Sequence, residues 1–258
     1  MIDKFKIIRP SKAAKQIIRW SKDYLENSGK TGFVVGISGG IDSALTANLI
    51  AMTDKPVTLL YLPIKNHGSE EARATELGEQ LAERYEHVTF KKINLIRIFL
   101  EFQNKLFEYD NDLAFANSKS RIRMTALYQV AQTLDSLVVG TGNMVEDFGI
   151  GFYTKYGDGG VDISPIADLT KTEVYQMVAD VFGDVPFAIQ KAPPSDGLWD
   201  DRRNDEDQIG ATYKELEWAM GRPTAKTERE KEVLAIYERL NKASQHKMKM
   251  PPICKIRL

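Results

Sequence analysis

Short apolar runs alternate with segments of helical spacing along the first 141 residues. Four runs are continuous enough to predict strands buried on both faces: residues 33–37, 56–62, 88–95 and 136–141. Helical spacing precedes and separates them at residues 11–27, 44–52, 69–85, 96–107 and 112–134. This alternation predicts an α/β fold, a doubly wound and mostly parallel sheet with helices on both faces. Ligands of such sheets bind at the carboxyl ends of the strands.

The pattern changes after residue 149. Five glycines between Gly149 and Gly160 predict a loop whose backbone a ligand can approach closely. Residues 192–204 are rich in Pro, Asp, Gly and Arg, which predicts an exposed, mobile loop. Helices are expected at residues 170–182, 205–220 and 227–242. We expect one domain over residues 1–258 that ends in a C-terminal tail, residues 243–258.

Composition narrows the class of protein. Hydrophobic residues make up 43% and charged residues 28% of the 258 residues, which is typical of a globular protein. The net charge of −1 gives no general attraction to nucleic acid or to a membrane. Cys254 is the only cysteine, so an internal disulfide and a CxxC site are excluded. No signal peptide and no apolar run of membrane-spanning length is found, and we expect a cytoplasmic protein.

The loop after the first predicted strand carries the main chemical signal, Ser38-Gly39-Gly40-Ile41-Asp42-Ser43. Two glycines let the backbone turn tightly, and the helix that follows directs its N–H groups and positive dipole end at the same space. Asp42 would repel a bare phosphate, so a divalent cation between them explains its place. The plainer interpretation is a glycine turn that opens a helix, with Asp42 as a first-turn acid.

The complete string is more specific than its glycines. It is neither a Gly-Lys-Ser/Thr P-loop nor a Gly-x-Gly-x-x-Gly dinucleotide motif. It resembles the pyrophosphate loop of the ATP pyrophosphatase family, the adenine nucleotide alpha hydrolase-like group. The resemblance implies cleavage of ATP between the α- and β-phosphates, transfer of AMP to an acceptor oxygen and release of pyrophosphate. Argininosuccinate, asparagine, guanylate and NAD synthetases and tRNA-modifying enzymes share this loop, so it leaves the acceptor open.

Further segments are similar to NAD synthetases, in one order between residues 33 and 252. They are Asn-x-x-x-Arg-x-Arg-Met at 117–124, Gly-Thr-x-Asn-x-x-Glu at 140–146, the glycine loop at 154–162, and residues 165–174, 194–199, 205–207 and 246–252. The resemblance implies ATP-dependent amidation of deamido-NAD (nicotinate adenine dinucleotide) by ammonia. The products would be NAD, AMP and pyrophosphate, formed through an adenylated intermediate, with Mg²⁺ as cofactor.

The same resemblance assigns roles to single residues. It implies a metal pair, Asp42 and Glu146, and no side-chain nucleophile. It implies a mobile lid near residues 192–207. The ATP-binding residues would be Gly36, Ile37, Ser38, Gly39, Gly40, Ile41, Asp42, Ser43, Thr141, Lys171 and Ser195. The deamido-NAD-binding residues would be Arg121, Lys155, Asp162, His246 and Lys247.

Helix geometry and spacing add detail to these roles. Arg121 and Arg123 lie two apart on a predicted helix and diverge by about 200°, so only one can face a pocket fully. The resemblance points to Arg121. Lys171 stands near a predicted helix start, where a cation is unfavourable, and this favours a phosphate-binding role. The stretch between Glu146 and Lys155 is one residue longer than the family's common pattern.

The sequence also allows expectations about the nitrogen donor of the reaction and about the oligomeric state. About 30 residues precede the first predicted strand and Cys254 lies in the tail, which does not fit a glutaminase, so free ammonia is the expected donor. The resemblance implies a homodimer with the substrate site at the subunit interface. Apolar helical segments such as residues 126–134 suit a core or an interface equally well.

Two alternatives belong to other functional classes. A tRNA-modifying enzyme with the same loop should show a basic surface or catalytic cysteines, which the charge of −1 and the single cysteine disfavour. A non-catalytic nucleotide-binding module would leave Asp42, Glu146 and Lys171 without a role. Another pyrophosphate-loop ligase is the alternative within the same class. We expect neither nucleic acid nor a membrane as a partner.

Overall fold

The computed structural model describes residues 9–64, 68–195, 197–199 and 204–256. In this part of the chain a four-stranded parallel sheet has the order β3-β2-β1-β4. An isolated parallel bridge between Val139 and Ile163 extends the sheet beyond β4. The predicted doubly wound parallel sheet is confirmed. The strands are β1 (Gly32–Gly36), β2 (Val57–Tyr61), β3 (Val88–Lys92) and β4 (Ser136–Val139).

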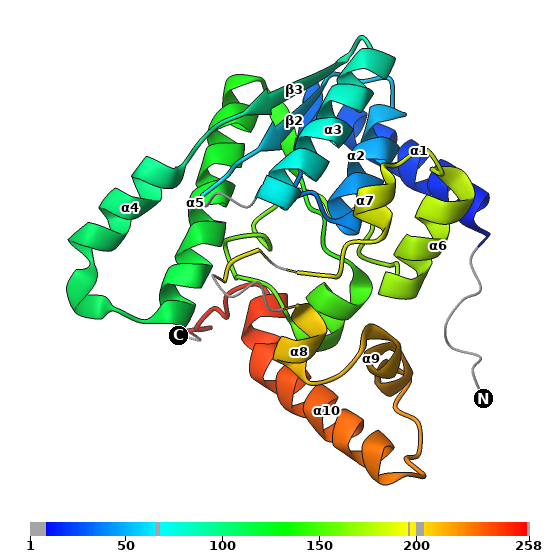
Figure 1. Ribbon diagram of the computed structural model, residues 1–258, viewed down its shortest axis with the longest axis vertical. Helices are drawn as coiled ribbons and strands as arrows, with labels where there is room; N and C mark the ends of the chain where they lie inside the picture. Colours follow the sequence, from blue (N-terminus) through cyan, green and yellow to red (C-terminus); the bar gives the residue numbers. More distant parts are fainter. Residues whose placement is uncertain (1–8, 65–67, 196, 200–203, 257–258) are drawn as a thin grey trace.

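Strand side chains alternate between two apolar layers. Val35 lies in the core on one face, with side chains of α1 (Pro10–Ser28), α2 (Ile41–Ala51), α3 (Gly68–Arg84) and α6 (Lys171–Val181). Val34, its neighbour, lies in the core on the other face with α4 (Ile96–Lys105) and α5 (Asp112–Thr133). Figure 1 shows these two groups of helices on opposite sides of the strands. Because successive strand residues point to opposite faces, both faces of the sheet carry apolar side chains that helices cover.

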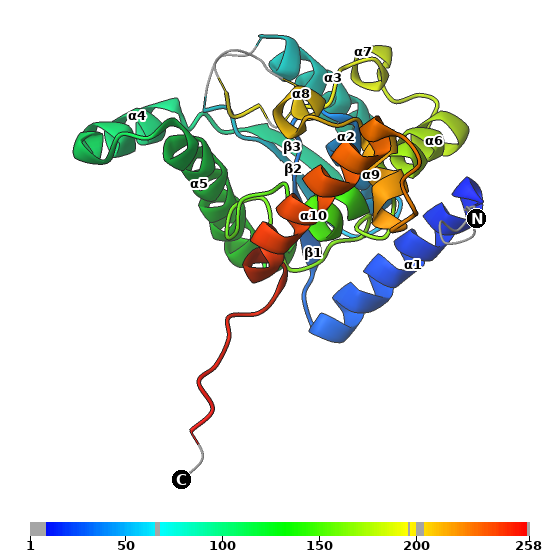
Figure 2. The ribbon, with the colours of Figure 1, turned by 90° about the horizontal axis from the view of Figure 1, so that it is seen from below.

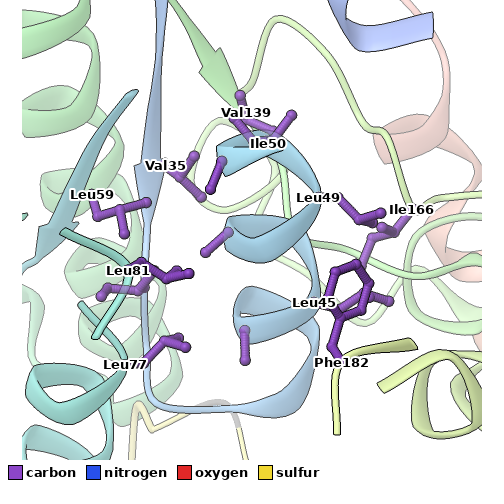
Figure 3. Close-up of a cluster of buried hydrophobic side chains, with 14 of the residues drawn as sticks. Val35, Leu45, Leu49, Ile50, Leu59, Leu77, Leu81, Val139, Ile166 and Phe182 are labelled. Atoms are coloured by element: carbon purple, nitrogen blue, oxygen red, sulfur yellow. The ribbon is translucent and has the colours of Figure 1, made fainter. Parts of the chain in front are cut away.

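Helix α2 is enclosed on all sides. Every residue of α2 except Asp42 is buried. Figure 3 shows Leu45, Leu49 and Ile50 of this helix between strand side chains, among them Val35, and side chains of the neighbouring segments. Such close packing holds the helix rigidly, so the loop that leads into it has a fixed position.

A further layer covers one end of the sheet. The π-helix η2 (Val145–Ile150), α8 (Asp205–Ile209), α9 (Tyr213–Met220) and α10 (Glu228–Met248) share a third apolar cluster. Helix α10 lies below the sheet in Figure 1 and crosses it in the view from below in Figure 2. Two short elements complete the described chain, η1 (Phe107–Tyr109) and α7 (Phe187–Gln190).

Several element boundaries differ from the expectations. The single helix predicted over residues 205–220 is wrong, because Gly210 takes the left-handed region at φ 84° and ends α8. Thr212 then caps α9 in a capping box with Glu215. Helix α10 continues through Met248, past the start of the tail predicted at residue 243. The π-helix η2 and α7 were not predicted.

The predicted mobile loop and the apolar segment 126–134 are the next two expectations to compare with the structure. Residues 196 and 200–203 of the predicted mobile loop lie outside the described residues. The apolar segment 126–134 packs mainly inward, since Ala131 is buried in the α5 side of the core beside Leu127 and Val130. Among the described residues, no helix has both the length and the apolar character needed to cross a bilayer.

Candidate active site

The candidate site lies where the strand order reverses. The chain passes from β1 to β2 on one side, whereas β4 pairs with β1 on the other, which makes the β1–β4 boundary a topological switch point. A cavity of about 530 Å³ opens there, a size typical of small-molecule sites. Its walls come from the loop after β1, the segment after β4, α3, α5, the glycine loop, Lys171 and α10.

The loop after β1 is braced from within and from behind. Gly39 has φ +84°, and a Cβ atom there would lie 2.6 Å from the Glu70 carbonyl oxygen. Arg73 Nε of α3 donates to the Gly39 carbonyl oxygen at 2.8 Å. Ser38 N donates to Ser43 Oγ at 3.1 Å, and Ser43 Oγ donates to the Gly40 carbonyl oxygen at 2.9 Å. The open N-terminal turn of α2 is thereby held at the cavity.

The predicted ATP-binding residues gather at this cavity with one exception. Gly39 does not line it but lies behind the loop, against α3. The residues that do line it are Gly36, Ile37, Ser38, Gly40, Ile41, Asp42, Ser43, Thr141, Lys171 and Ser195.

Asp42 and Glu146 hold the ammonium group of Lys171 between them. Lys171 Nζ lies 2.5 Å from Asp42 Oδ2 and 3.0 Å from Glu146 Oε1. The Lys171 side chain is 4% exposed, and the two carboxylate side chains are 16% and 17% exposed. The fold therefore brings together the predicted acidic pair, from α2 and η2, and adds a buried cation from the first residue of α6.

Two neutral groups orient this cluster. Asn143 Nδ2 donates to Asp42 Oδ1 at 3.1 Å, while the Asn143 side-chain oxygen accepts from the backbone N–H of Glu146 at 3.2 Å. The Tyr213 hydroxyl donates to Glu146 Oε1 at 2.6 Å, and its ring centroid lies 4.7 Å from Lys171 Nζ. The hydroxyl also lies 3.2 Å from Asp205 Oδ2 on α8. Hydrogen bonds of this kind fix the direction in which a carboxylate presents its free lone pairs.

Burial and charge set the protonation states. Burial alone would lower the pKa of Lys171, but the charges and hydrogen bonds of Asp42 and Glu146 outweigh it, so the pKa is raised. Burial also raises the pKa of the Tyr213 hydroxyl, and the charges of Glu146 and Asp205 raise it further. Lys171 is therefore an ammonium cation at neutral pH, and Tyr213 is an un-ionised hydrogen-bond donor.

The glycine loop is fastened to α5. The Ser120 hydroxyl donates to Asp158 Oδ1 at 2.6 Å, and Thr154 N donates to the same oxygen at 3.0 Å. The Thr154 hydroxyl donates to Asn117 Oδ1 at 2.5 Å. Asn117 and Ser120 lie on one face of α5 and line the cavity with Asp158. Both sequence segments that carry the Asn-x-x-x-Arg and glycine-loop patterns thus form one wall.

The predicted dinucleotide-binding residues lie mostly beside the cavity. Lys247 of α10 lines it and donates to the carbonyl oxygens of Gly151 and Tyr153. Lys155 Nζ donates to the His246 carbonyl oxygen at 2.6 Å, and Arg121 Nε donates to the Lys155 carbonyl oxygen at 3.3 Å. These hydrogen bonds join Arg121, Lys155 and His246 in a row on the surface next to the cavity. Lys247 follows His246 in the chain and continues this row into the cavity.

Two residues predicted to bind deamido-NAD, Arg121 and Asp162, lie outside the cavity. Arg123, not Arg121, lines the cavity, and its Nε donates to the Leu62 carbonyl oxygen at 3.0 Å. Arg121 is exposed outside it. Asp162 does not line the cavity either: it accepts hydrogen bonds from Val138 N at 2.7 Å and from the Tyr128 hydroxyl at 3.0 Å. Asp162 therefore braces β4 against α5.

Comparison with known proteins decides among the pyrophosphate-loop enzymes. A family model described as NAD synthase matches residues 13–251. The chain belongs to the NAD synthase family. A protein of Alkaliphilus metalliredigens named NH(3)-dependent NAD(+) synthetase is 41% identical, over 93% of this chain and 96% of its own length. The fold is also similar to solved structures, two of which bear different names.

One of these structures is NMN synthetase from Francisella tularensis. It superposes with a TM-score of 0.87 at 31% identity, over 96% of this chain and all of that one. The other is NH3-dependent NAD synthetase from Campylobacter jejuni, with a TM-score of 0.76 at 25% identity and the same coverage. Both likenesses therefore cover nearly the whole chain.

The stretch between Glu146 and Lys155, which we expect to be one residue longer than the family's common pattern, contains most of η2. A π-helix takes more residues per turn than an α-helix, so it accommodates such an insertion, and π-turns recur at functional sites. The second residue of η2, Glu146, is half-buried at the Lys171 ammonium. The next, Asp147, lines the cavity against Gly142, where any Cβ would collide with its carboxylate. Burial, helped by the charges of Glu146, Asp158 and Asp42, raises the pKa of Asp147 to about 8.

Sequence reasoning missed several members of the site. Asn143 stands in the quoted Gly-Thr-x-Asn-x-x-Glu segment, and an Asn three residues before an acid at a helix start is a recognisable capping signal. Tyr213 carries no such local signal, because its partner Glu146 is 67 residues away in the chain. Arg73 likewise reaches Gly39 across 34 residues.

The donor set suits a cation held by few protein ligands. Within the described residues, no group of three or more His, Cys, Asp or Glu side chains could hold a metal ion. Asp42 and Glu146 do converge closely enough to hold one positive charge, that of Lys171. Mg²⁺ is commonly bound by one or two carboxylates, with waters and substrate phosphates completing its coordination. The pair therefore fits Mg²⁺ that arrives with a nucleotide.

Proposed function

We propose that this chain forms NAD by ATP-dependent amidation of deamido-NAD with ammonia. The observation that carries the proposal is the Asp42–Lys171–Glu146 cluster beside a glycine loop and a helix N-terminus at the switch point. This arrangement suits the displacement of pyrophosphate from ATP. Membership of the NAD synthase family and the 41% identity to an NH(3)-dependent NAD(+) synthetase support the acceptor and the nitrogen donor.

In the first step, the nicotinate carboxylate attacks the α-phosphorus of ATP and pyrophosphate leaves. The pyrophosphate gains negative charge, which the N–H groups at the start of α2 and the ammonium of Lys171 stabilise. The Ser38 and Ser43 hydroxyls add donors at the same loop. Bound Mg²⁺, held by Asp42 and Glu146, would supply further positive charge to the phosphate oxygens.

In the second step, ammonia attacks the acyl carbon of the adenylate. A new C–N bond forms, the bond from the acyl carbon to the AMP oxygen breaks, and the nitrogen loses a proton. Water would destroy the adenylate, so the site has to be closed during this step. We assign that closure to the lid near residues 192–207, whose described part places Ser195 at the cavity. No side-chain nucleophile is needed.

The acceptor is proposed to lie along the row formed by Arg121, Lys155, His246 and Lys247. Positive charges at Arg121, Lys155 and Lys247 suit the diphosphate of deamido-NAD. Asp162, which is held at β4 by Val138 N, is proposed to accept a hydrogen bond from the substrate as well as from the protein. We also propose that the protein acts in the cytoplasm.

We also propose a homodimer, with the partner subunit completing the acceptor site. Large apolar side chains of α4, η1 and the start of α5 are exposed. Figure 1 shows α4 and α5 as an arm at one side of the molecule. Phe107, Tyr109 and Leu113 are 68%, 75% and 58% exposed. Contiguous exposed apolar surface of this kind is typical of an association surface. The arm continues along α5 to Arg121, at the acceptor row.

A second acceptor, nicotinate mononucleotide, is favoured by one observation. The superposition on NMN synthetase has a TM-score of 0.87, against 0.76 for the NAD synthetase from Campylobacter jejuni. The chemistry at the carboxylate would be identical, so the difference lies in whether an adenylate half must also be bound.

One assay separates these possibilities. Purified protein is incubated with ATP, Mg²⁺ and ammonium, and with either deamido-NAD or nicotinate mononucleotide, while AMP and the amide product are quantified. The proposal expects NAD and AMP in equal amounts and a higher kcat/KM with deamido-NAD. A higher kcat/KM with the mononucleotide would establish the second acceptor. Folded protein that forms neither amide would refute amidation altogether.

A further inference from the structure

The carboxylate pair already carries a cation in this structure, and that cation belongs to the chain. Lys171 Nζ contacts one oxygen of each carboxylate, at 2.5 Å and 3.0 Å. A divalent cation bound to the same two oxygens would lie about 2.1 Å from each. Because it would share both oxygens with the ammonium, it would stand less than about 5 Å from it, where like charges repel strongly in a half-buried site. The ammonium and the metal therefore exclude one another from this position.

The backbone of Lys171 is fixed while its side chain can turn. Thr170 caps α6 through a capping box with Glu173, in which Thr170 N donates to Glu173 Oε2 at 2.8 Å and Glu173 N donates to Thr170 Oγ1 at 3.2 Å. The lysine stem has four rotatable bonds beyond this anchor and lines the cavity. Its head can therefore leave the carboxylates for phosphate oxygens in the cavity without any movement of α6.

The neighbours of the ammonium hold the carboxylates in place when it leaves. Asn143 keeps its hydrogen bond to Asp42 Oδ1, and the Tyr213 hydroxyl keeps its hydrogen bond to Glu146 Oε1. The Tyr213 ring also stabilises the ammonium while it is at the carboxylates. The pair thus remains aligned for a second cation of higher charge.

We propose that Lys171 is a tethered placeholder cation that keeps the Asp42–Glu146 pair closed to divalent metal until a nucleotide arrives. The triphosphate attracts the ammonium into the cavity, and the vacated pair takes the metal that accompanies the nucleotide. This inference rests on the metal assignment in the proposed function. Its consequence is that metal alone binds weakly and that metal and ATP bind together.

The test is the affinity for Mn²⁺ without nucleotide, measured by electron paramagnetic resonance of the free ion. Lys171→Met removes the charge and keeps an apolar stem of similar length, and Lys171→Arg keeps the charge. We expect Lys171→Met to bind one Mn²⁺ at least about tenfold more tightly than the unmodified protein. Lys171→Arg should bind it as weakly as the unmodified protein. Equal Mn²⁺ affinity in Lys171→Met and the unmodified protein would overturn the inference.

A stability measurement gives an independent result that does not need activity. Lys171→Met leaves two carboxylates without their cation, so its midpoint of thermal unfolding in EDTA should be lower, and Mn²⁺ should restore it. Lys119→Met is the control: Lys119 is another buried lysine, and it donates to the Leu198 carbonyl oxygen at 2.7 Å. Its loss of stability should not respond to Mn²⁺. If Lys171→Met folds in Mn²⁺ but not in EDTA, the metal ion replaces the ammonium in the folded protein, which supports the inference most strongly. If it folds in neither, Lys171→Gln replaces it in both measurements, with the same expectations.

A double variant separates this inference from the metal assignment. In the Lys171→Met, Asp42→Asn protein, the tight Mn²⁺ binding should disappear. If tight binding persists there, the metal assignment fails. If the pair binds Mn²⁺ equally well with and without the lysine, and loses it with Asp42→Asn, the metal assignment stands and the placeholder alone is wrong.

Discussion

Lys171 balances the charges at the centre of the site. A cation at the first residue of a helix opposes the helix dipole, and burial adds to the cost. Two carboxylates at hydrogen-bond distance outweigh both effects. A lysine in this position serves the charge of the site and not the helix, and the phosphate-binding role expected from the sequence stays a prediction.

Replacement of Asn143 tests how much the orientation of the Asp42 carboxylate contributes to activity. Asn143→Ala removes the hydrogen bond to Asp42 Oδ1 and the contacts to the backbone of η2. We expect kcat/KM of amide formation to fall roughly 10–100-fold, as for other residues that orient metal ligands. Asn48→Ala is the control, since among the described residues the side chain of this buried Asn bonds only within α2, to the Ala44 carbonyl oxygen. An unchanged kcat/KM in Asn143→Ala would mean that Asp42 needs no orienting partner.

Gly39 tests the brace behind the loop. A Cβ atom at this left-handed residue would press on the Glu70 backbone of α3, and neither backbone can yield cheaply. We expect Gly39→Ala to lose about 1–3 kcal/mol of unfolding free energy and to weaken ATP binding. Urea unfolding and nucleotide titration measure the two effects. Gly183→Ala, where the nearest atom would lie at an ordinary 3.7 Å, should change neither. Tight ATP binding by Gly39→Ala would show that the loop geometry is not required.

At the scale of elements, the strands and the helices of the sheet could be predicted because their signals are local. Apolar runs of strand length, a glycine pair after β1 and helical spacing each lie within one short window. The break between α8 and α9 was missed because Gly210 is a single residue in an otherwise helical pattern. The π-helix was missed because its 6 residues, Val145–Ile150, are too few to show an apolar periodicity.

The pairing of α9 with α10 gives a prediction about pH. Arg229 of α10 donates to both carboxylate oxygens of Glu215 on α9, at 2.8 Å and 2.9 Å. This hydrogen bonding, with the α9 cap, lowers the pKa of Glu215 from 4.5 to about 2. A lowered folded-state pKa contributes stability above pH 4.5 that is lost as the pH falls towards 2.

The matching variant is Glu215→Gln, which keeps the cap chemistry but not the charge. Because the pair is partly exposed, we expect a loss of only about 1 kcal/mol in unfolding free energy at pH 7. The difference from the unmodified protein should shrink between pH 4.5 and the lowest pH at which both proteins fold. Glu228→Gln, from an exposed pair with Lys231, should have little effect at any pH. A difference that does not change with pH would exclude the ion pair as its cause.

At the scale of the whole molecule, the proposed dimer depends on the exposed apolar arm. Phe107→Asp and Leu113→Asp place charge on that surface without touching the buried core. We expect both variants to be monomers by light scattering, whereas the unmodified protein has twice that mass. Phe187→Asp is the control, since Phe187 is 71% exposed on α7, on the other side of the molecule from the arm (Figure 1). A dimer that survives both arm variants would place the interface elsewhere.

The site as a whole was partly predictable. Asp42, Glu146 and Lys171 could be found because each lies in a short motif. The parallel sheet brings together the ends of β1 and β4, which lead to Asp42 and Glu146. The inward turn of Arg123 in place of Arg121 depends on the rotation of α5 about its axis, which packing sets. Tyr213 joins the site from a separate layer, through a contact that exists only in the folded chain.

The central claim is that the substrate carboxylate attacks the α-phosphorus of ATP. It is tested most directly with deamido-NAD that carries ¹⁸O in both carboxylate oxygens, incubated with ATP, Mg²⁺ and ammonium and followed by mass spectrometry. We predict one ¹⁸O atom in AMP and one in the amide of NAD at each turnover. Labelled phosphate with ADP as product, or labelled pyrophosphate with unlabelled AMP, would contradict it, because the attack would then fall on the γ- or the β-phosphorus.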